Sequence, residues 1–107
     1  MTTKQARKRT QLSKQQLEAY IRAESLDSQN VFFTNHVRQQ MRKRHISVAC
    51  VISTLREGRI KRTPEPNTML GTLECRMEHY CTGHNIGVVV AISDDEPDLV
   101  LVTAMYI

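Results

Sequence analysis

The sequence predicts a single α+β domain in which N-terminal helices pack on one face of a four-stranded, mostly antiparallel sheet. Two patterns predict this fold class: apolar residues recur at helical spacing up to Gly58, and they alternate along the chain after it. The 107 residues suffice for one domain, and the content of 40% hydrophobic and 24% charged residues is typical of a globular chain. No apolar run approaches the ~20 residues of a membrane span, so we expect no membrane partner.

Residues 1–11 read as a basic arm that precedes the domain, which we place at residues 12–107. Four Lys or Arg residues fall between Lys4 and Arg9, and no apolar periodicity accompanies them. We expect such an arm to become ordered only against phosphate or against a partner.

The first helix should begin directly after Ser13. Ser13 and Gln16 have the spacing of a capping box, and Leu12 and Leu17 have the spacing of the hydrophobic staple that accompanies it. We expect this helix to end near Leu26.

Two further helices are predicted before the sheet begins. Thr34 is a good N-cap for the second helix, and Ser47 caps the third, which should end at Gly58. The third helix carries an apolar stripe at helical spacing. Its members are Val48, Val51, Ile52 and Leu55.

The second half of the chain predicts four strands. The prolines at positions 64 and 66 predict a loop at residues 63–67, and residues 94–97 should form a hairpin loop. The predicted strands are residues 59–63, 70–80, 86–92 and 99–106.

The charge of the chain is divided unevenly between its two halves. Residues 1–62 carry 14 Lys or Arg against 4 Asp or Glu, whereas residues 63–107 carry one Arg against 7 Asp or Glu. This split favours a polyanionic partner such as nucleic acid, although ordinary solvated helix faces also produce basic surfaces. The candidate nucleic-acid-binding residues are Lys4, Arg7, Lys8, Arg9, Arg38, Arg42, Lys43, Arg44, Arg59, Lys61 and Arg62.

Three residues have the chemistry for RNA cleavage without a metal. His36 stands at the start of the second helix, where the helix dipole favours a bound phosphate. Glu74 and Arg76 are two residues apart in a strand and so share a face, opposite Leu73 and Cys75. The carboxylate can take a proton from the 2′-hydroxyl, the guanidinium can stabilise the phosphorane, and the imidazole can protonate the leaving oxygen. The alternative is a surface histidine and a salt bridge on a solvated sheet face.

The cysteine and histidine residues predict neither a metal nor another cofactor. Cys75, His79, Cys81 and His84 follow each other too closely for paired zinc ligands separated by a long loop. Three cysteines are an odd number, and residues 1–10 lack the apolar stretch of a secretory signal. We therefore expect free thiols and a cytoplasmic protein.

Several short motifs resemble those of a known group of bacterial domains. They are Thr34-x-His36, Arg44-x-Ile46-Ser47, Gly58, and the closing strand with Thr103 and Tyr106. Over residues 33–107 the chain resembles an uncharacterised bacterial family of unknown function close to BrnT and, more loosely, to the RelE/ParE/MqsR toxin superfamily. His36, Arg44, Arg76 and Thr103 are the positions that match. His45 departs from the pattern, which has a small residue there, often glycine.

The resemblance implies a RelE/BrnT-like fold and a ribonuclease role. We therefore expect a toxin-like or effector-like, metal-independent endoribonuclease that acts on RNA, on the ribosome or off it, and that pairs with an antitoxin or immunity protein. The alternative is a non-catalytic module on the same fold that binds nucleic acid or protein. Convergence of His36, Glu74 and Arg76 on one concave site would favour the enzyme.

Overall fold

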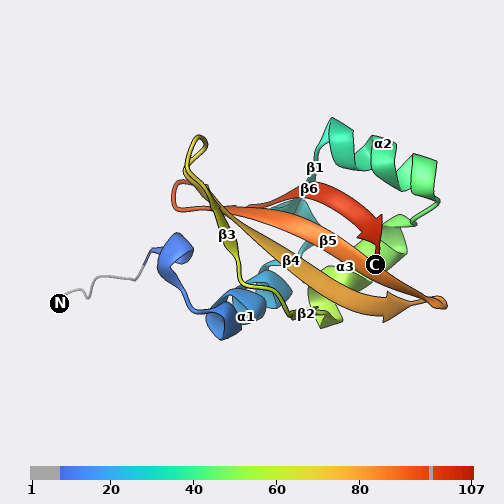
Figure 1. Ribbon diagram of the computed structural model, residues 1–107, viewed down its shortest axis with the longest axis horizontal. Helices are drawn as coiled ribbons and strands as arrows, with labels where there is room; N and C mark the ends of the chain where they lie inside the picture. Colours follow the sequence, from blue (N-terminus) through green and yellow to red (C-terminus); the bar gives the residue numbers. More distant parts are fainter. Residues whose placement is uncertain (1–7, 97) are drawn as a thin grey trace.

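The computed structural model describes residues 8–96 and 98–107 and confirms the α+β class (Figure 1). The predicted arm residues Lys4 and Arg7 lie outside the described residues, as does Pro97 of the hairpin loop. The helices are α1 (Lys14–Glu24), α2 (Asn35–Arg44) and α3 (Val48–Glu57), with short 3-10 turns at Arg9–Gln11 and Ser28–Asn30. The strands are β1 (Val31–Phe33), β2 (Arg59–Ile60), β3 (Glu65–Asn67), β4 (Thr72–Cys81), β5 (His84–Ser93) and β6 (Leu99–Tyr106).

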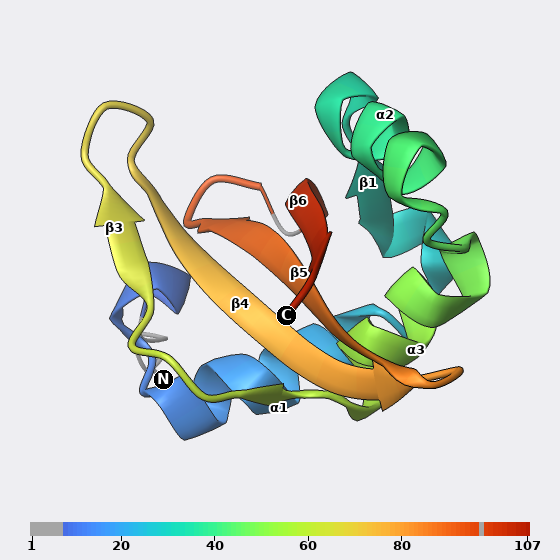
Figure 2. The same ribbon diagram turned by 45° about the vertical axis from the view of Figure 1, so that its right-hand side comes forward.

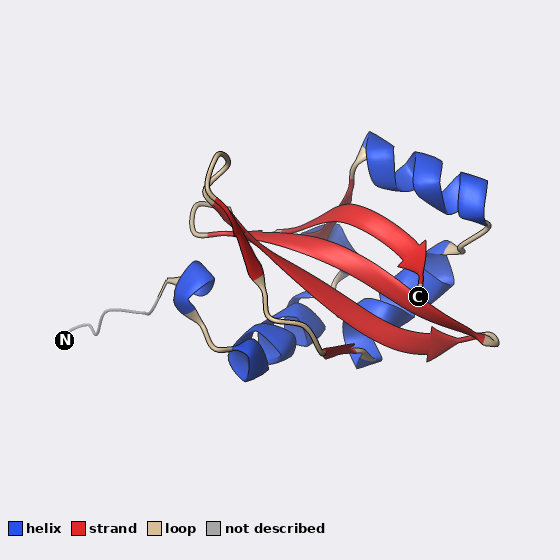
Figure 3. Cartoon of the chain, in the orientation of Figure 1, coloured by secondary structure: helices blue, strands red, loops and turns tan. Residues whose placement is uncertain are grey.

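The sheet has six strands in the described residues, so the expectation of four is wrong (Figure 3). The strand order is β1-β6-β5-β4-β2, and β3 pairs with β4 beside that path. β1 is parallel to β6, with Val31 opposite Leu99, and all the other pairings are antiparallel. The expected loop at residues 63–67 contains β3, which pairs with β4 alone. On such an edge strand a proline loses no hydrogen bond on the side that has no neighbouring strand. The first predicted strand shortens to its first two residues.

The helices do not all lie on one face of the sheet. Figure 2 shows α1 and α3 beneath the sheet and α2 standing at its edge beside β6. The apolar side of β4, with Leu73, Cys75 and Met77, packs in the buried core with Val51 and Leu55 of α3. The face of the sheet that carries the alternate residues of β4 is therefore left open. No helix in the described part of the chain combines the length and apolarity that crossing a membrane demands.

The predicted helix starts are confirmed by their hydrogen bonds. The Ser13 hydroxyl accepts from the Gln16 amide at 3.1 Å, and the Gln16 side chain accepts in return from the Ser13 amide at 2.9 Å. The hydroxyls of Thr34 and Ser47 accept from the amides three residues further on, each at 3.1 Å. α1 ends at Glu24, slightly earlier than predicted.

Two details of α3 differ from the prediction. Val48 is 57% exposed because it is the first residue of the helix, so it does not belong to the buried stripe. The stripe includes Thr54 instead, whose hydroxyl donates to the Cys50 carbonyl at 2.7 Å. Gly58 ends the helix in an extended conformation, and a Cβ there would press on the Thr54 carbonyl and lie 2.8 Å from that of Glu78. Glycine is therefore needed because α3 approaches β4 closely.

The expectation of free thiols is wrong for two of the three cysteines. Cys50 of α3 and Cys81 at the end of β4 form a disulfide, across a separation of 31 residues. The packing of α3 under the sheet brings them together, and their spacing gives no sign of it. Cys75 is free and buried, and its burial raises the pKa of the thiol to about 12. The disulfide ties the β4–β5 hairpin to the helical layer.

The start of the described chain is anchored to the turn after β5. The Thr10 amide and hydroxyl donate to the two carboxylate oxygens of Asp94 at 2.9 and 2.8 Å. The Arg9 guanidinium donates to the carbonyls of Ser93 and Asp94 at 2.8 and 2.9 Å. Arg9, which the sequence suggested as a phosphate ligand, thus already has partners within the domain.

We expect Asp94→Ala to release this anchor. The hydrogen bond from the Thr10 amide lowers the pKa of Asp94, so the carboxylate stabilises the anchor at neutral pH and loses that effect as the pH falls through the lowered value. Hydrogen exchange at pH 7 should be faster at the Thr10 amide in Asp94→Ala, and the wild-type Thr10 resonance should titrate with a midpoint below the ordinary value for Asp. Asp95→Ala is the matched control. Unchanged exchange in Asp94→Ala would contradict the anchor.

Candidate active site on the open face of the sheet

Arg76 and Thr103 stand in one row across the open face. In the register of the sheet, Arg76 lies opposite Val89, and Val89 lies opposite Thr103. Residues directly opposite each other point to the same side of a sheet. The position matched by the resemblance on β6 and the predicted guanidinium on β4 are therefore separated by one side chain.

Arg76 is held in place by Glu78, a residue that the sequence reasoning did not assign to the site. Its Nε and Nη2 donate to the same carboxylate oxygen of Glu78 at 3.0 and 2.8 Å, and both side chains are largely buried, with 15% and 13% exposed. Nη1 lies 4.0 Å from the Met105 sulfur. The guanidinium is thus fixed above β5, between Glu78 of β4 and Met105 of β6. The two-residue spacing of Arg76 and Glu78 in the strand was the signal that could have revealed the pair.

Glu74 shares a hollow of about 220 Å³ with Arg76. Its carboxylate accepts one long hydrogen bond, 3.4 Å from the Asn67 amide nitrogen, and forms no ion pair with Arg76. The carboxylate therefore keeps acceptor capacity for a ligand in the hollow. The other residues that line it are Arg62, Thr63, Glu65, Val89 and Met105.

α2 is docked along the part of β6 that β1 leaves unpaired. The Thr34 hydroxyl donates to the Leu101 carbonyl at 2.8 Å. The Gln40 side chain accepts from the Ala104 amide at 3.0 Å, and Arg44 donates to the Ala104 carbonyl at 2.7 Å. Arg44, predicted as a phosphate ligand, instead caps the edge of the sheet. These contacts fix where the start of α2 stands relative to the open face.

His36 stands at the exposed start of α2, and its Nε2 lies 2.9 Å from the amide nitrogen of Gln40. Because the Gln40 oxygen already accepts from Ala104, its amide nitrogen must donate to His36. Nε2 is then the acceptor, which places the proton of the neutral ring on Nδ1.

The turn of the helix decides which way His36 faces. Val37 and Met41 are buried in the core, and Gln40 and Arg44 reach the β6 edge. At about 100° per residue, His36 lies one step further round the helix, on the side that turns toward the open face.

Glu74 and Arg76 are brought together, whereas His36 lines a different hollow. That second hollow, of about 580 Å³, is formed by α2 itself and shares no lining residue with the first. Gln40 was missed by the sequence reasoning, since only the fold reveals that it holds both His36 and β6.

The predicted phosphate-binding cations divide into two groups. Some already have partners: Arg9 and Arg44 as described, and Arg38, which donates to the Phe33 carbonyl at 3.3 Å and packs over the Phe33 ring. The others have no hydrogen-bond or ion-pair partner for the side chain among the described residues. These are Lys8, Arg42, Lys43, Arg59, Lys61 and Arg62.

Tyr106 and His45 meet on the side of the sheet away from Arg76. The Tyr106 hydroxyl donates to the His45 carbonyl at 3.1 Å, and the Tyr106 ring lies 5.0 Å from that of His84. His45 ends α2 in the left-handed conformation, with φ of 57°. Glycine adopts this conformation without strain, which accounts physically for the small residue expected at this position. Tyr106 is thus a structural contact at the end of α2.

No cluster of three or more metal-ligating side chains exists in residues 8–96 and 98–107. The family model described as Domain of unknown function (DUF4258) matches residues 33–106, from the end of β1 to the end of β6. The expectation of an uncharacterised domain family is confirmed, with α1 outside the matched region. Comparisons with curated proteins and with solved structures gave no match.

Proposed function

The chain belongs to the DUF4258 family, and we propose that it is a metal-independent endoribonuclease of the toxin-like or effector-like type suggested by its resemblance to BrnT and RelE. One observation carries the proposal: a guanidinium fixed by two hydrogen bonds lies beside a carboxylate that has no ion-pair partner among the described residues, in one hollow on an open sheet face. A phosphodiester in this hollow would meet both groups without the guanidinium having to be reoriented.

The proposed reaction is transesterification within the RNA strand. Glu74 takes the proton of a 2′-hydroxyl, and the oxygen attacks the adjacent phosphorus. Arg76 stabilises the charge of the phosphorane, while Glu78 holds the guanidinium in place. The departing 5′-oxygen also needs a proton. His36 of α2, which lines the separate hollow, supplies it only as imidazolium, and that form must first release its hydrogen bond from the Gln40 amide. The products are a 2′,3′-cyclic phosphate and a 5′-hydroxyl, so no water is consumed and no redox change occurs.

A non-catalytic nucleic-acid-binding module is the second candidate. It is favoured by the separate hollow in which His36 lies and by the unpaired cations Arg42 and Lys43 on α2. Binding through such cations requires no convergence with Glu74. RNA is the expected partner in both cases, with the ribosome as one context, and an antitoxin or immunity protein would be the partner that restrains the enzyme.

Incubation with total RNA and with ribosomes, in the presence and absence of EDTA, tests the proposal. Cleavage that EDTA leaves unchanged, with 2′,3′-cyclic phosphate ends, is the expected result. Glu74→Gln should abolish it, whereas Glu65→Gln, a matched change in the same hollow, should not. RNA binding without cleavage in any of these conditions would leave the binding module as the function. No binding at low salt would refute both candidates, because phosphate contacts are strongest there.

A further inference from the structure

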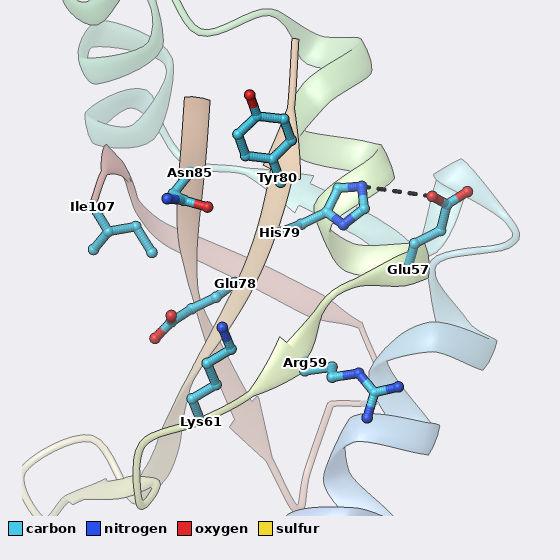
Figure 4. Close-up of a pocket in the computed structure, with 8 residues that line it drawn as sticks. All are labelled: Glu57, Arg59, Lys61, Glu78, His79, Tyr80, Asn85 and Ile107. Atoms are coloured by element: carbon cyan, nitrogen blue, oxygen red, sulfur yellow. Dashed lines mark ion pairs between the residues drawn. The ribbon is translucent and has the colours of Figure 1, made fainter. Parts of the chain in front are cut away.

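A further hollow, distinct from the two described above, lies on the sheet beyond the Arg76–Glu78 pair. Tyr80 forms its aromatic wall (Figure 4). It has a volume of about 390 Å³ and is lined from β4, from the start of β5 and from the chain that follows α3. Tyr80 is 65% exposed, unlike the buried apolar residues on the other side of β4. A large aromatic ring that stands free on a strand offers a surface on which a flat ligand can stack.

We propose that this hollow binds one nucleobase of a single-stranded RNA, with the base stacked on Tyr80 and its edge contacted by Asn85. Tyr80 and Asn85 lie directly opposite each other in the β4–β5 register, so their side chains leave the same face about 5 Å apart. A ring and an amide side by side supply both stacking and hydrogen bonds to a base edge. Figure 4 shows both side chains on neighbouring strands at the same end of the hollow.

Two cations in the hollow are available to phosphate, although two carboxylates also line it. Glu78 is paired with Arg76, and Glu57 lies 3.5 Å from His79 Nε2 at the outer edge (Figure 4). The two cations that line the hollow, Arg59 and Lys61, have no side-chain partner among the described residues. Proteins that bind single-stranded nucleic acids combine cations for the phosphates with an aromatic side chain for the bases.

The new hollow adjoins the proposed catalytic one through a single ion pair. Glu78 lines the hollow with Tyr80, and Arg76 lines the hollow with Glu74. Tyr80 is four residues from Arg76 along β4, roughly 13 Å at the rise of a strand. The same RNA strand can therefore place one base on Tyr80 and a phosphate beside Glu74. This inference rests on the proposed function for its choice of RNA. It assigns a nucleotide of the same strand that lies several positions from the reacting phosphate, since Tyr80 is six residues from Glu74 along β4, roughly 20 Å.

Binding of a non-cleavable oligonucleotide tests the inference separately from catalysis. The probe is a fluorescent single-stranded 2′-O-methyl RNA, which lacks the free 2′-hydroxyl that cleavage requires. Tyr80→Leu should weaken its binding roughly 5- to 150-fold, the range expected from the loss of one stacked base. Tyr80→Phe should bind as the wild type does, because the ring remains. Tyr106→Leu, which removes an aromatic ring from the other side of the sheet, should also leave the affinity unchanged.

Two further variants separate the base contact from the phosphate contact. Asn85→Ala should reduce the difference in affinity between homopolymers of the four bases. Lys61→Gln should weaken binding to all of them and lower the slope of log affinity against log salt by about 0.7. Wild-type affinity in Tyr80→Leu would overturn the inference even if RNA is cleaved. Weakened binding in that variant, together with no cleavage by the wild type, would retain the inference and refute the enzyme.

Discussion

Arg76→Ala is expected to slow RNA cleavage about a hundredfold, a loss of ~3 kcal/mol of transition-state stabilisation. The guanidinium is held on the open face by Glu78 and is the only group proposed to meet the charge of the phosphorane. Single-turnover cleavage of a short RNA measures the effect. Glu78→Gln should cause a smaller loss, because the neutral amide can still accept a hydrogen bond but holds the guanidinium less firmly.

The control for Arg76→Ala must address folding as well as catalysis. Removing the arginine leaves the largely buried Glu78 without its partner, which costs stability by itself. The double variant Arg76→Ala with Glu78→Gln removes that cost and should still be slow. Wild-type rates in a folded double variant would rule out Arg76 as a catalytic residue.

His36→Ala is the companion change and should cost roughly 10²- to 10⁴-fold, the usual contribution of a general acid. Gln39→Ala, in the same hollow of α2 but without an ionisable group, is the matched control and should have little effect. If His36→Ala cleaves normally while Arg76→Ala does not, the proton of the leaving group comes from another donor.

The local elements of the fold could be predicted because their signals are local. The caps at Ser13, Thr34 and Ser47 each involve residues at most three positions apart, and the alternation in β4 separates its two faces by spacing alone. β1 and β3 were not predicted, since strands of three residues are too short for a period. Their pairing is decided by partners on β6 and β4 that are distant in sequence.

The candidate site divides in the same way, into residues placed by local spacing and residues placed by long-range contacts. Glu74 and Arg76 share a face because of their spacing, and they line one hollow. The position of His36 depends on how α2 docks, and that depends on contacts from Thr34, Gln40 and Arg44 to the backbone of β6. No spacing in the sequence encodes these contacts. The same holds for the Cys50–Cys81 disulfide, which the packing of α3 under β4 creates.

Leu55→Ala is expected to destabilise the domain by roughly 2–5 kcal/mol. Leu55 is fully buried in the core between α3 and the sheet, in the same cluster as Met77, so the truncation leaves a cavity where the neighbouring helix and strand cannot close up completely. Urea unfolding followed by circular dichroism measures the change as a lower midpoint with an unchanged slope.

Val48→Ala is the matched control for Leu55→Ala, on the same helix and with a side chain 57% exposed. It should change stability by no more than about 0.5 kcal/mol, as surface substitutions usually do. The contrast tests which side of α3 packs on the core face of β4, the face that carries Leu73, Cys75 and Met77. Equal midpoints for the two variants would mean that α3 docks by a different face from the one that carries Leu55.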